Sequence, residues 1–465
     1  MLVILLDGAG KGNTMIDNLH QVLHRINLQY ADALYDLQSD LVIRKNKDRE
    51  NISSRTIKGI SLRGFTDNGW VYANTNNTNQ ASIRKLARQL NRQRPKSQSA
   101  RLAQPEPITL DKALRMKKNP QDVLLEDKIQ RVRDIFNLAM GMDERIADVR
   151  VAYSDILMDR TLASSAGTSA RQLIPRTKIS LAVIVKENGT TEYDTTQVGG
   201  TVGFEVVDDL SEELVRETVD SAVEQLKAVA APSGLQTVLL DPGVVGTVCH
   251  ESFGHGLEAD QALRGRSYLK EMLGKKVASE LVTMYEDASF EGAFGSYLFD
   301  DDGVPARKNT IVEDGILVSF IHDMESAASM NASLTSNSRT QNASRRRFIR
   351  MTNTYAKPGD WNMKDMIQDT KDGVLMMHWQ YGMEDPLGAG MEVVSNKGYL
   401  IKNGQKTTPL KSITLTGRVL EVLGNVDAVS KDGFMVDAGN CGKGSEDFVP
   451  VGSGGTWWRT KAVLA

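Results

Sequence analysis

Residues 241–256 read DPGVVGTVCHESFGHG, and the apolar run Val238-Leu239-Leu240 precedes them. A short apolar run that stops at a turn predicts a buried strand. Asp241 can cap the first turn of a helix, and Pro242 suits the first helical position because that position needs no N–H donor. The stretch therefore predicts a strand followed by one helix, whose far end carries two histidines and a glutamate.

His250, Glu251 and His255 form an H-E-x-x-x-H array at that far end. In the common H-E-x-x-H motif the histidines are four apart, about 40° around the helix, so both can face one metal. Five apart is about 140°, which requires the helix to widen by one residue or to end. Gly254 and Gly256 tolerate the π-like or left-handed backbone that this needs. The array predicts a zinc site in which Glu251 accepts a proton from a water on the metal.

A catalytic zinc normally has three protein ligands, so a third donor is expected outside the array. We interpret Cys249 as a packing residue, because it faces elsewhere on the helix than its neighbour His250. Cys441 lies in the glycine-flanked turn DAGNCGKG, which can hold a thiolate rigidly. Residue chemistry alone leaves Cys441 and Glu258 open as the third ligand, and a purely structural metal site also stays open. The full set of candidates considered is Cys249, Cys441, Glu258, Asp260, His322 and His378.

Beyond residue 230, hairpin signals are frequent and glycine is dense. Ala231-Pro232-Ser233-Gly234 is a plausible boundary, and Asp314-Gly315 and Asn403-Gly404 each follow or precede an apolar run. We expect residues 231–465 to form a mainly antiparallel, β-rich catalytic domain that carries the active-site helix.

The region before residue 230 shows a weak repeat of element types. Tyr30-Ala31-Asp32 and Ile146-Ala147-Asp148 each follow a helical pattern and precede strands and a second helix. We expect an α+β fold in which residues 15–230 form an N-terminal domain of two similar halves. Residues 1–14 are expected to be a disordered lead-in, and residues 91–122 an exposed connection.

Composition excludes several classes of protein. The 465 residues include two cysteines and six histidines, with 56 Lys+Arg against 59 Asp+Glu. Two cysteines cannot build a disulfide scaffold or an iron–sulfur site. The apolar stretch Leu2–Leu6 is too short for a signal peptide, and no run approaches the roughly 20 apolar residues of a membrane span. We therefore expect a cytoplasmic protein that does not associate with membranes.

Two other patterns offer rival interpretations. His20 and His24 are four apart on the first helix, although histidines on a polar helix face are usually solvated. Seven basic residues and no acid lie between Arg84 and Arg101, and Arg345-Arg346-Arg347 adds a second cluster. The net charge of −3 and the lack of interleaved aromatics argue against nucleic-acid binding. The alternative function is a non-catalytic regulatory or nucleic-acid-associated partner protein with a structural metal site.

Several further motifs accompany the histidine array in a fixed order and together span about residues 235–451. They are HESFGHGLEAD (250–260), DDGVPA (301–306), RMTNTY (350–355), GYLIKNG (398–404) and NCGKG (440–444). In these motifs the C-terminal half resembles the TldD/PmbA family of metalloproteases, and specifically its zinc-bearing TldD type. The N-terminal half fits the family in length and element order. The segments SEDFVP after Gly444 and GGTWW at 454–458 depart from the family pattern.

The resemblance implies that His250, His255 and Cys441 bind Zn²⁺ and that Glu251 is the general base. It implies a zinc-dependent metalloprotease that hydrolyses peptide bonds in unfolded peptides threaded to an enclosed site. It also implies pairing with a related PmbA/TldE-type subunit, with a second copy of the chain as the other option.

Three further residues are candidates for substrate contact. His322, at the end of the Phe320-Ile321 strand, can donate to an oxyanion or be a hydrogen-bonded packing histidine. Arg350 and Asn353 can hold a peptide backbone or carboxylate, or else be a surface salt bridge and a turn residue. Exposed strand edges would suit a peptide added as an extra strand.

Overall fold

The computed structural model describes residues 14–93, 101–444 and 446–465. The expected lead-in over residues 1–14 therefore lies outside the described residues, apart from Thr14. Thr14 caps helix α1 (Met15–Leu23) by accepting a hydrogen bond from the backbone N–H of Asp17. Among the described residues, no helix has the length and apolar character needed to cross a membrane.

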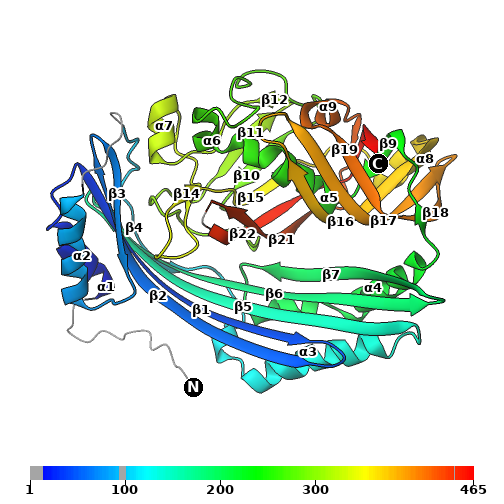
Figure 1. Cartoon of the computed structure of the whole chain (residues 1–465), viewed down its shortest axis with the longest axis horizontal. Helices are drawn as coiled ribbons and strands as arrows, with labels where there is room; N and C mark the ends of the chain where they lie inside the picture. Colours follow the sequence, from blue (N-terminus) through cyan, green and yellow to red (C-terminus); the bar gives the residue numbers. More distant parts are fainter. Residues whose placement is uncertain (1–13, 94–100, 445) are drawn as a thin grey trace.

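A seven-stranded sheet forms the N-terminal part, and its strand order has an internal symmetry (Figure 1). β1 (Tyr30–Lys45) and β5 (Ile146–Ser164) pair antiparallel at its centre. Each half contains a helix, three strands and a second helix, in the orders α1-β1-β2-β3-α2 and α3-β5-β6-β7-α4. This repeat confirms the prediction of an α+β region built from two similar halves. The other elements are β2 (Glu50–Thr66), β3 (Gly69–Thr75), α2 (Gln80–Arg92), β4 (Thr109–Ala113), α3 (Leu125–Met140), β6 (Ser169–Glu187), β7 (Thr190–Gly200) and α4 (Glu212–Gln225).

The expectation of a plain exposed connection over residues 91–122 is wrong in part. β4 pairs in parallel with the first residues of β6, and a short 3₁₀ helix spans Pro120–Asp122. The side chains of β4 are exposed or half-buried, so the segment has no apolar alternation for a sequence pattern to detect. Backbone hydrogen bonds to β6 hold this edge strand, together with Leu110, which packs against a small apolar cluster that includes Leu162 and Phe299. Residues 94–100 lie outside the described residues.

The basic residues on α2 occupy the solvated face of an amphipathic helix. Ile83, Leu86 and Leu90 are buried, whereas Arg84 and Arg88 are exposed. This agrees with the interpretation of the segment as a solvated face. Arg94 and Lys96, which belong to the same basic run, lie outside the described residues.

The C-terminal part contains a ring of five strands within its larger sheet. β16 (Asp372–Glu384) pairs with both β9 (Gly234–Leu240) and β17 (Gly390–Lys402), which closes the order β16-β9-β23-β19-β17. Most pairings are antiparallel, as predicted for this half. The remaining strands of the sheet are β8 (Val229–Ala230), β18 (Gln405–Lys411), β19 (Ile413–Arg418), β20 (Ala428–Val429) and β23 (Trp458–Leu464).

A second sheet of six strands lies beside the ring in the order β12-β11-β10-β15-β22-β21. Its hairpin β21 (Met435–Lys443)–β22 (Glu446–Gly455) carries Cys441. Its other strands are β10 (Met284–Asp287), β11 (Lys308–Glu313), β12 (Ile316–Leu317) and β15 (Asn353–Ala356). Shorter elements are α6 (Ala259–Leu263), α7 (Met324–Met330), β13 (Ser338–Arg339), β14 (Phe348–Ile349), α8 (Met363–Asp369) and α9 (Val419–Gly424).

Figure 1 shows the long N-terminal sheet as a curved layer along one side of the C-terminal strands. Buried ion pairs join the two parts: Arg63 contacts Asp302 at 2.7 Å, and Arg347 contacts Asp32 at 2.7 Å. The side chain of Arg347 is only 5% exposed, whereas Arg345 and Arg346 are exposed, so one member of the Arg345–Arg347 cluster is withdrawn into a buried ion pair. The chain leaves the N-terminal sheet after β7 and joins the larger C-terminal sheet at β8, next to the domain boundary at 230/231 that we propose.

Candidate metal centre

The helix predicted after β9 changes its geometry along its length. α5 (Pro242–Thr247) begins at Asp241, whose carboxylate accepts a hydrogen bond from the Val244 N–H at 2.7 Å. Residues Val248–Phe253 then form a π-helix, in which the Gly254 N–H donates to the carbonyl of Cys249, five residues back. This confirms the widening by one residue that the five-residue histidine spacing requires.

Gly246 fixes the position of this helix. A Cβ atom at Gly246 would lie 2.5 Å from the backbone N of Gly454 on β22, so only glycine allows the helix to touch the strand. The contact sets the helix against the hairpin that carries Cys441.

His250, His255 and Cys441 come together at this junction. Their ligand atoms all lie within 4.8 Å of one another, and Cys441 Sγ is 3.5 Å from His255 Nε2. Both ring nitrogens of His250 are buried and make no hydrogen bond among the described residues. A buried polar atom without a partner is costly, so this imidazole is suited to bind a metal ion. Two imidazoles and one thiolate are a donor set that zinc favours, with a fourth position left for water.

The electrostatics of the cluster suit a divalent cation. Burial would raise the pKa of Cys441, but the neighbouring His250 and His255 lower it to about 5, which favours the thiolate. Burial would lower the pKa of His255, but the Cys441 thiolate and nearby carboxylates raise it well above its usual value. The same anionic surroundings that raise this pKa attract a metal ion.

Glu251 lies on the metal-facing side of His255. Its Oε2 atom is 3.4 Å from His255 Nε2, and its side chain is 31% exposed. Burial would raise its pKa, but the two histidines lower it, so the carboxylate is ionised at neutral pH. A Cβ atom at Gly382 on β16 would lie 3.1 Å from Glu251 Cβ, so this glycine lets the strand run directly beside the glutamate.

Glu258 contacts the opposite nitrogen of His255. Glu258 Oε1 lies 3.6 Å from His255 Nδ1, and its Oε2 atom is 2.8 Å from Lys443 Nζ. The alternative that Glu258 is the third ligand is therefore wrong in this geometry, because its carboxylate is on the far side of the ring. A carboxylate on the outer nitrogen of a metal-binding histidine orients the ring, as in other metal sites. Lys443 was not anticipated, although it lies in the NCGKG motif.

Glu384, at the end of β16, is a further residue that sequence reasoning missed. Burial is the main cause that raises its pKa, to about 7, and it interacts electrostatically with His255 and Glu251. The sequence does not identify Glu384, because it lies more than 120 residues after the H-E-x-x-x-H array and its strand has no unusual pattern of polar residues.

The three residues proposed for substrate contact lie inside the protein. His322 is 2% exposed, its Nδ1 is 3.3 Å from Ser326 Oγ, and burial lowers its pKa to about 4. This position fits a packing histidine. Arg350 is fully buried and donates to the carbonyl of Cys441, so it is not a surface residue and holds the hairpin backbone instead.

Asn353 is also fully buried. Its amide group donates to the Asp287 carbonyl and to Ser296 Oγ, and accepts from the Gly295 N–H. It lies in β15 and not in a turn. We therefore assign Asn353 a structural role and not a contact with substrate.

Among the described residues, neither His20 nor His24 belongs to a group of three metal-capable donors. The group of metal-capable donors found among the described residues consists of His250, His255 and Cys441. His24 follows the last residue of α1 and is exposed, as expected for a solvated histidine. Cys249 is fully buried in the apolar core, and burial raises the pKa of its thiol, which agrees with a packing role.

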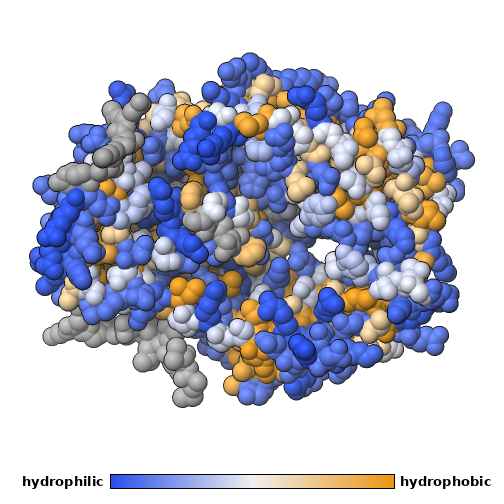
Figure 2. Space-filling view, in the orientation of Figure 1, coloured by the Kyte–Doolittle hydropathy of each residue, from blue (hydrophilic) through white to orange (hydrophobic). Residues whose placement is uncertain are grey.

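A large cavity lies between the two parts of the molecule. It measures about 1830 Å³ and is lined from both sides, including Asp194 on β7, Trp379 on β16 and Asn440 on β21. Asn440 precedes Cys441, so the cavity adjoins the strand that carries the third donor. Figure 2 shows an opening in the surface between the two parts.

Sequence models for three domains of one family match the chain. Residues 36–93, 118–228 and 233–455 match, in order, domain 1, the central domain and the C-terminal domain of the PmbA/TldA metallopeptidases. Together these matches cover most of the chain.

Curated relatives match along most of their length. A metalloprotease of Methanocaldococcus jannaschii is 36% identical over 94% of this chain and 97% of its own. A metalloprotease TldD homolog of Haemophilus influenzae is 31% identical over 97% of this chain and 95% of its own length. A zinc metalloprotease TldD homolog of Saccharolobus solfataricus is 25% identical over 94% of this chain and 96% of its own length.

The fold also matches a solved structure. TldE from Thermococcus kodakarensis has a TM-score of 0.78 at 17% sequence identity, over 97% of this chain and 99% of that one. At this identity the match supports the fold alone. The sequence matches, which extend over nearly the whole chain, show that this chain belongs to the PmbA/TldD family and is a metallopeptidase.

Proposed function

We propose that this metallopeptidase uses one Zn²⁺ ion to hydrolyse peptide bonds in unfolded peptides, with His250, His255 and Cys441 as ligands and Glu251 as general base. The observation that carries the proposal is the convergence of two buried imidazoles and a low-pKa thiol within 4.8 Å. The zinc in the name of the Saccharolobus solfataricus relative supports the choice of metal.

A zinc ion at this site supplies a Lewis acid that polarises a peptide carbonyl and lowers the pKa of water. Glu251 accepts the proton of the attacking water and passes it to the leaving amine, and its carboxylate is ionised at neutral pH and so free to accept that proton. Glu258 fixes the ring of His255 from behind, and Arg350 holds the carbonyl of Cys441.

The cavity beside β21 supports an unfolded peptide as the substrate. At about 1830 Å³ it exceeds the roughly 300–1,000 Å³ of pockets for small ligands, and its lining is mixed in polarity. An extended chain can enter such a space, whereas a folded domain cannot. Trp379 and Phe448 offer apolar surface for side chains of the peptide.

The direct test uses the zinc-loaded wild type, Glu251→Gln and Glu384→Gln, with an unstructured peptide as substrate. We expect Glu251→Gln to keep its zinc and to lose on the order of 10²–10⁴-fold in kcat. Glu384→Gln, which changes the neighbouring carboxyl, should lose far less. Equal cleavage by wild type and Glu251→Gln, both with zinc, would refute the role of Glu251.

We also propose that the chain works with a related TldE-type subunit or with a second copy of itself, in the cytoplasm. The fold match to TldE supports a partner of the same architecture. The mass of the purified chain in solution tests self-association against its own 51.1 kDa. Co-purification with a co-expressed TldE-type chain tests the first option, and cell fractionation tests the location.

A further inference from the structure

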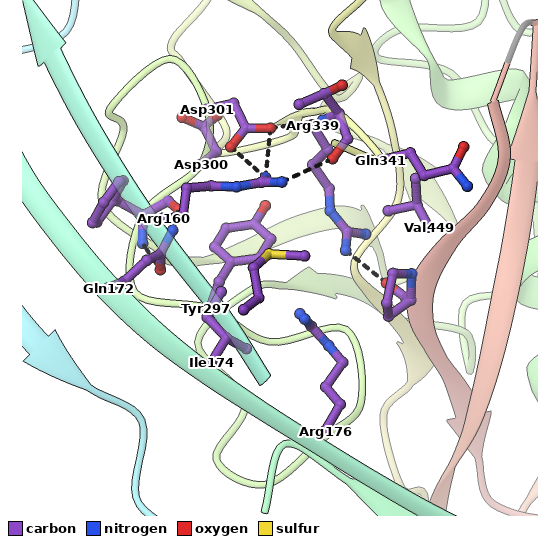
Figure 3. A pocket seen from close by; sticks show the side chains of 14 residues that line it. Arg160, Gln172, Ile174, Arg176, Tyr297, Asp300, Asp301, Arg339, Gln341 and Val449 are labelled. Carbon is purple, nitrogen blue, oxygen red and sulfur yellow. Dashed lines mark hydrogen bonds and ion pairs between the residues drawn. The ribbon is translucent and has the colours of Figure 1, made fainter. Parts of the chain in front are cut away.

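Three arginines from both parts of the molecule converge on a small internal cavity (Figure 3). Arg160 lies on β5, Arg176 on β6 and Arg339 on β13, and each is at least 95% buried. The polar lining also includes Tyr297, Asp300 and Asp301. The site is separate from the metal ligands, and no step of the proposed hydrolysis uses it.

Only one of the three arginines has a carboxylate partner among the described residues. Arg160 contacts Asp301 at 2.7 Å and Asp36 at 3.3 Å. Arg176 donates to the backbone carbonyls of Phe294 and Ser296, at 2.8 and 3.0 Å.

Arg339 likewise bonds backbone oxygens. It donates to the carbonyls of Met351 and Pro450, at 2.5 and 2.7 Å. Carbonyl oxygens satisfy the N–H groups of Arg176 and Arg339 but do not neutralise their charge.

The remaining acid of the cavity does not neutralise this charge. Asp300 accepts hydrogen bonds from the backbone N–H groups of Asp302, Val304 and Ser338, and burial raises its pKa well above the usual value. Burial and the charges of Arg339 and Arg160 lower the pKa of Arg176 to about 9, so Arg176 remains protonated at neutral pH. Among the described residues, the guanidinium groups of Arg176 and Arg339 thus have no carboxylate within ion-pair distance, and burying such charges is costly unless an anion joins them.

We propose that this cavity binds one small inorganic monovalent anion, with chloride as the physiological ion, between Arg176 and Arg339. The cavity measures about 30 Å³, where roughly 10–15 Å³ by the same measure holds one water molecule, so it has room for only a small group. This size fits a halide. The three arginines against Asp301 and Asp36 leave one excess positive charge, which a monovalent ion balances.

The anion would stabilise the contact between the two parts of the molecule. Arg176 belongs to the N-terminal sheet, whereas Arg339 bonds Pro450 on β22, which pairs with Asn440 next to Cys441. An ion held by both arginines therefore braces the hairpin that carries a proposed zinc ligand.

Crystals of the zinc-loaded full chain, grown in sodium bromide and measured at the bromine absorption edge, test the site directly. We expect one anomalous peak in the cavity, within about 3.5 Å of nitrogens of both Arg176 and Arg339. In solution, the Tm should rise saturably by about 2–4 °C as chloride replaces gluconate at constant ionic strength.

Two variants test whether the arginines cause this rise. Arg176→Met should abolish the chloride dependence of the Tm. Arg171→Met is the matched control, because Arg171 lies on the same strand but pairs with Asp159 at 2.7 Å, and it should keep the dependence.

Water alone in the cavity of the bromide crystals would overturn the proposal. The same chloride dependence in Arg176→Met as in wild type would also overturn it. If Arg176→Met does not fold, the bromide map of the wild type decides by itself.

Discussion

The carboxylate of Glu258 offers the sharpest test of how the protein prepares its metal site. Glu258 is 2% exposed, and its two oxygens lie 3.6 Å from His255 Nδ1 and 2.8 Å from Lys443 Nζ. Glu258→Gln keeps the size of the side chain but removes the charge that orients His255. Loss of such an outer carboxylate typically weakens metal binding by about 10–100-fold, or about 1.4–2.7 kcal/mol.

The fold should tolerate this change. Removing one partner of a buried ion pair usually costs about 3–5 kcal/mol, because the other charge is left alone. Here Lys443 keeps Asp260 at 2.8 Å, so we expect a smaller loss of stability.

Asp260→Asn is the matched control, since it removes a partner of Lys443 without touching His255. Zinc affinity is measured by competition with a chromophoric chelator at pH 7. Wild-type affinity in Glu258→Gln, or an equal loss in Asp260→Asn, would refute the orienting role.

Two further predictions concern the packing and the junction between the two parts. Gly246→Ala should destabilise the fold by about 1–3 kcal/mol in urea unfolding, because its Cβ would lie 2.5 Å from the β22 backbone. Gly424→Ala meets no atom within 4 Å and should be near neutral. His378 Nδ1 lies 2.7 Å from Asp194 Oδ1; burial opposes both charges, yet the pair raises the pKa of His378 and lowers that of Asp194. The histidine's contribution to the free energy of unfolding is complete below about pH 6.5 and is lost as the pH rises through its folded pKa. The aspartate's contribution to that free energy is complete above about pH 4. The Tm difference between wild type and His378→Asn should therefore be largest near pH 5 and smallest near pH 9, and the opposite trend would contradict the pairing.

The sequence was most informative where local geometry and chemistry agree. The five-residue spacing of His250 and His255 predicted a helix that widens by one residue or ends there, and the π-helix over Val248–Phe253 confirms the first of these. The two halves of the N-terminal sheet were predictable as a weak repeat of element types, which the orders α1-β1-β2-β3-α2 and α3-β5-β6-β7-α4 confirm.

Tertiary contacts account for what the sequence did not predict. For Arg350 and Asn353 the sequence left open a contact with substrate or a surface salt bridge and a turn residue, yet both side chains are fully buried. The role of Glu258 follows from the ring of His255 turning its Nδ1 outward, which no spacing rule indicates. The cavity of Arg160, Arg176 and Arg339 joins residues up to 179 positions apart, so only the folded chain brings them together.

The central claim is that one zinc ion joins the π-helix to the β21–β22 hairpin through two nitrogens and one sulfur. X-ray absorption at the zinc edge of the purified protein tests it most directly. The account predicts one sulfur at about 2.3 Å and two histidine nitrogens at about 2.0–2.1 Å, with one zinc per chain. The sulfur contribution should vanish in Cys441→Ser and persist in Cys249→Ser. A zinc shell of nitrogen and oxygen alone in the wild type, or a sulfur that remains in Cys441→Ser, would contradict the account.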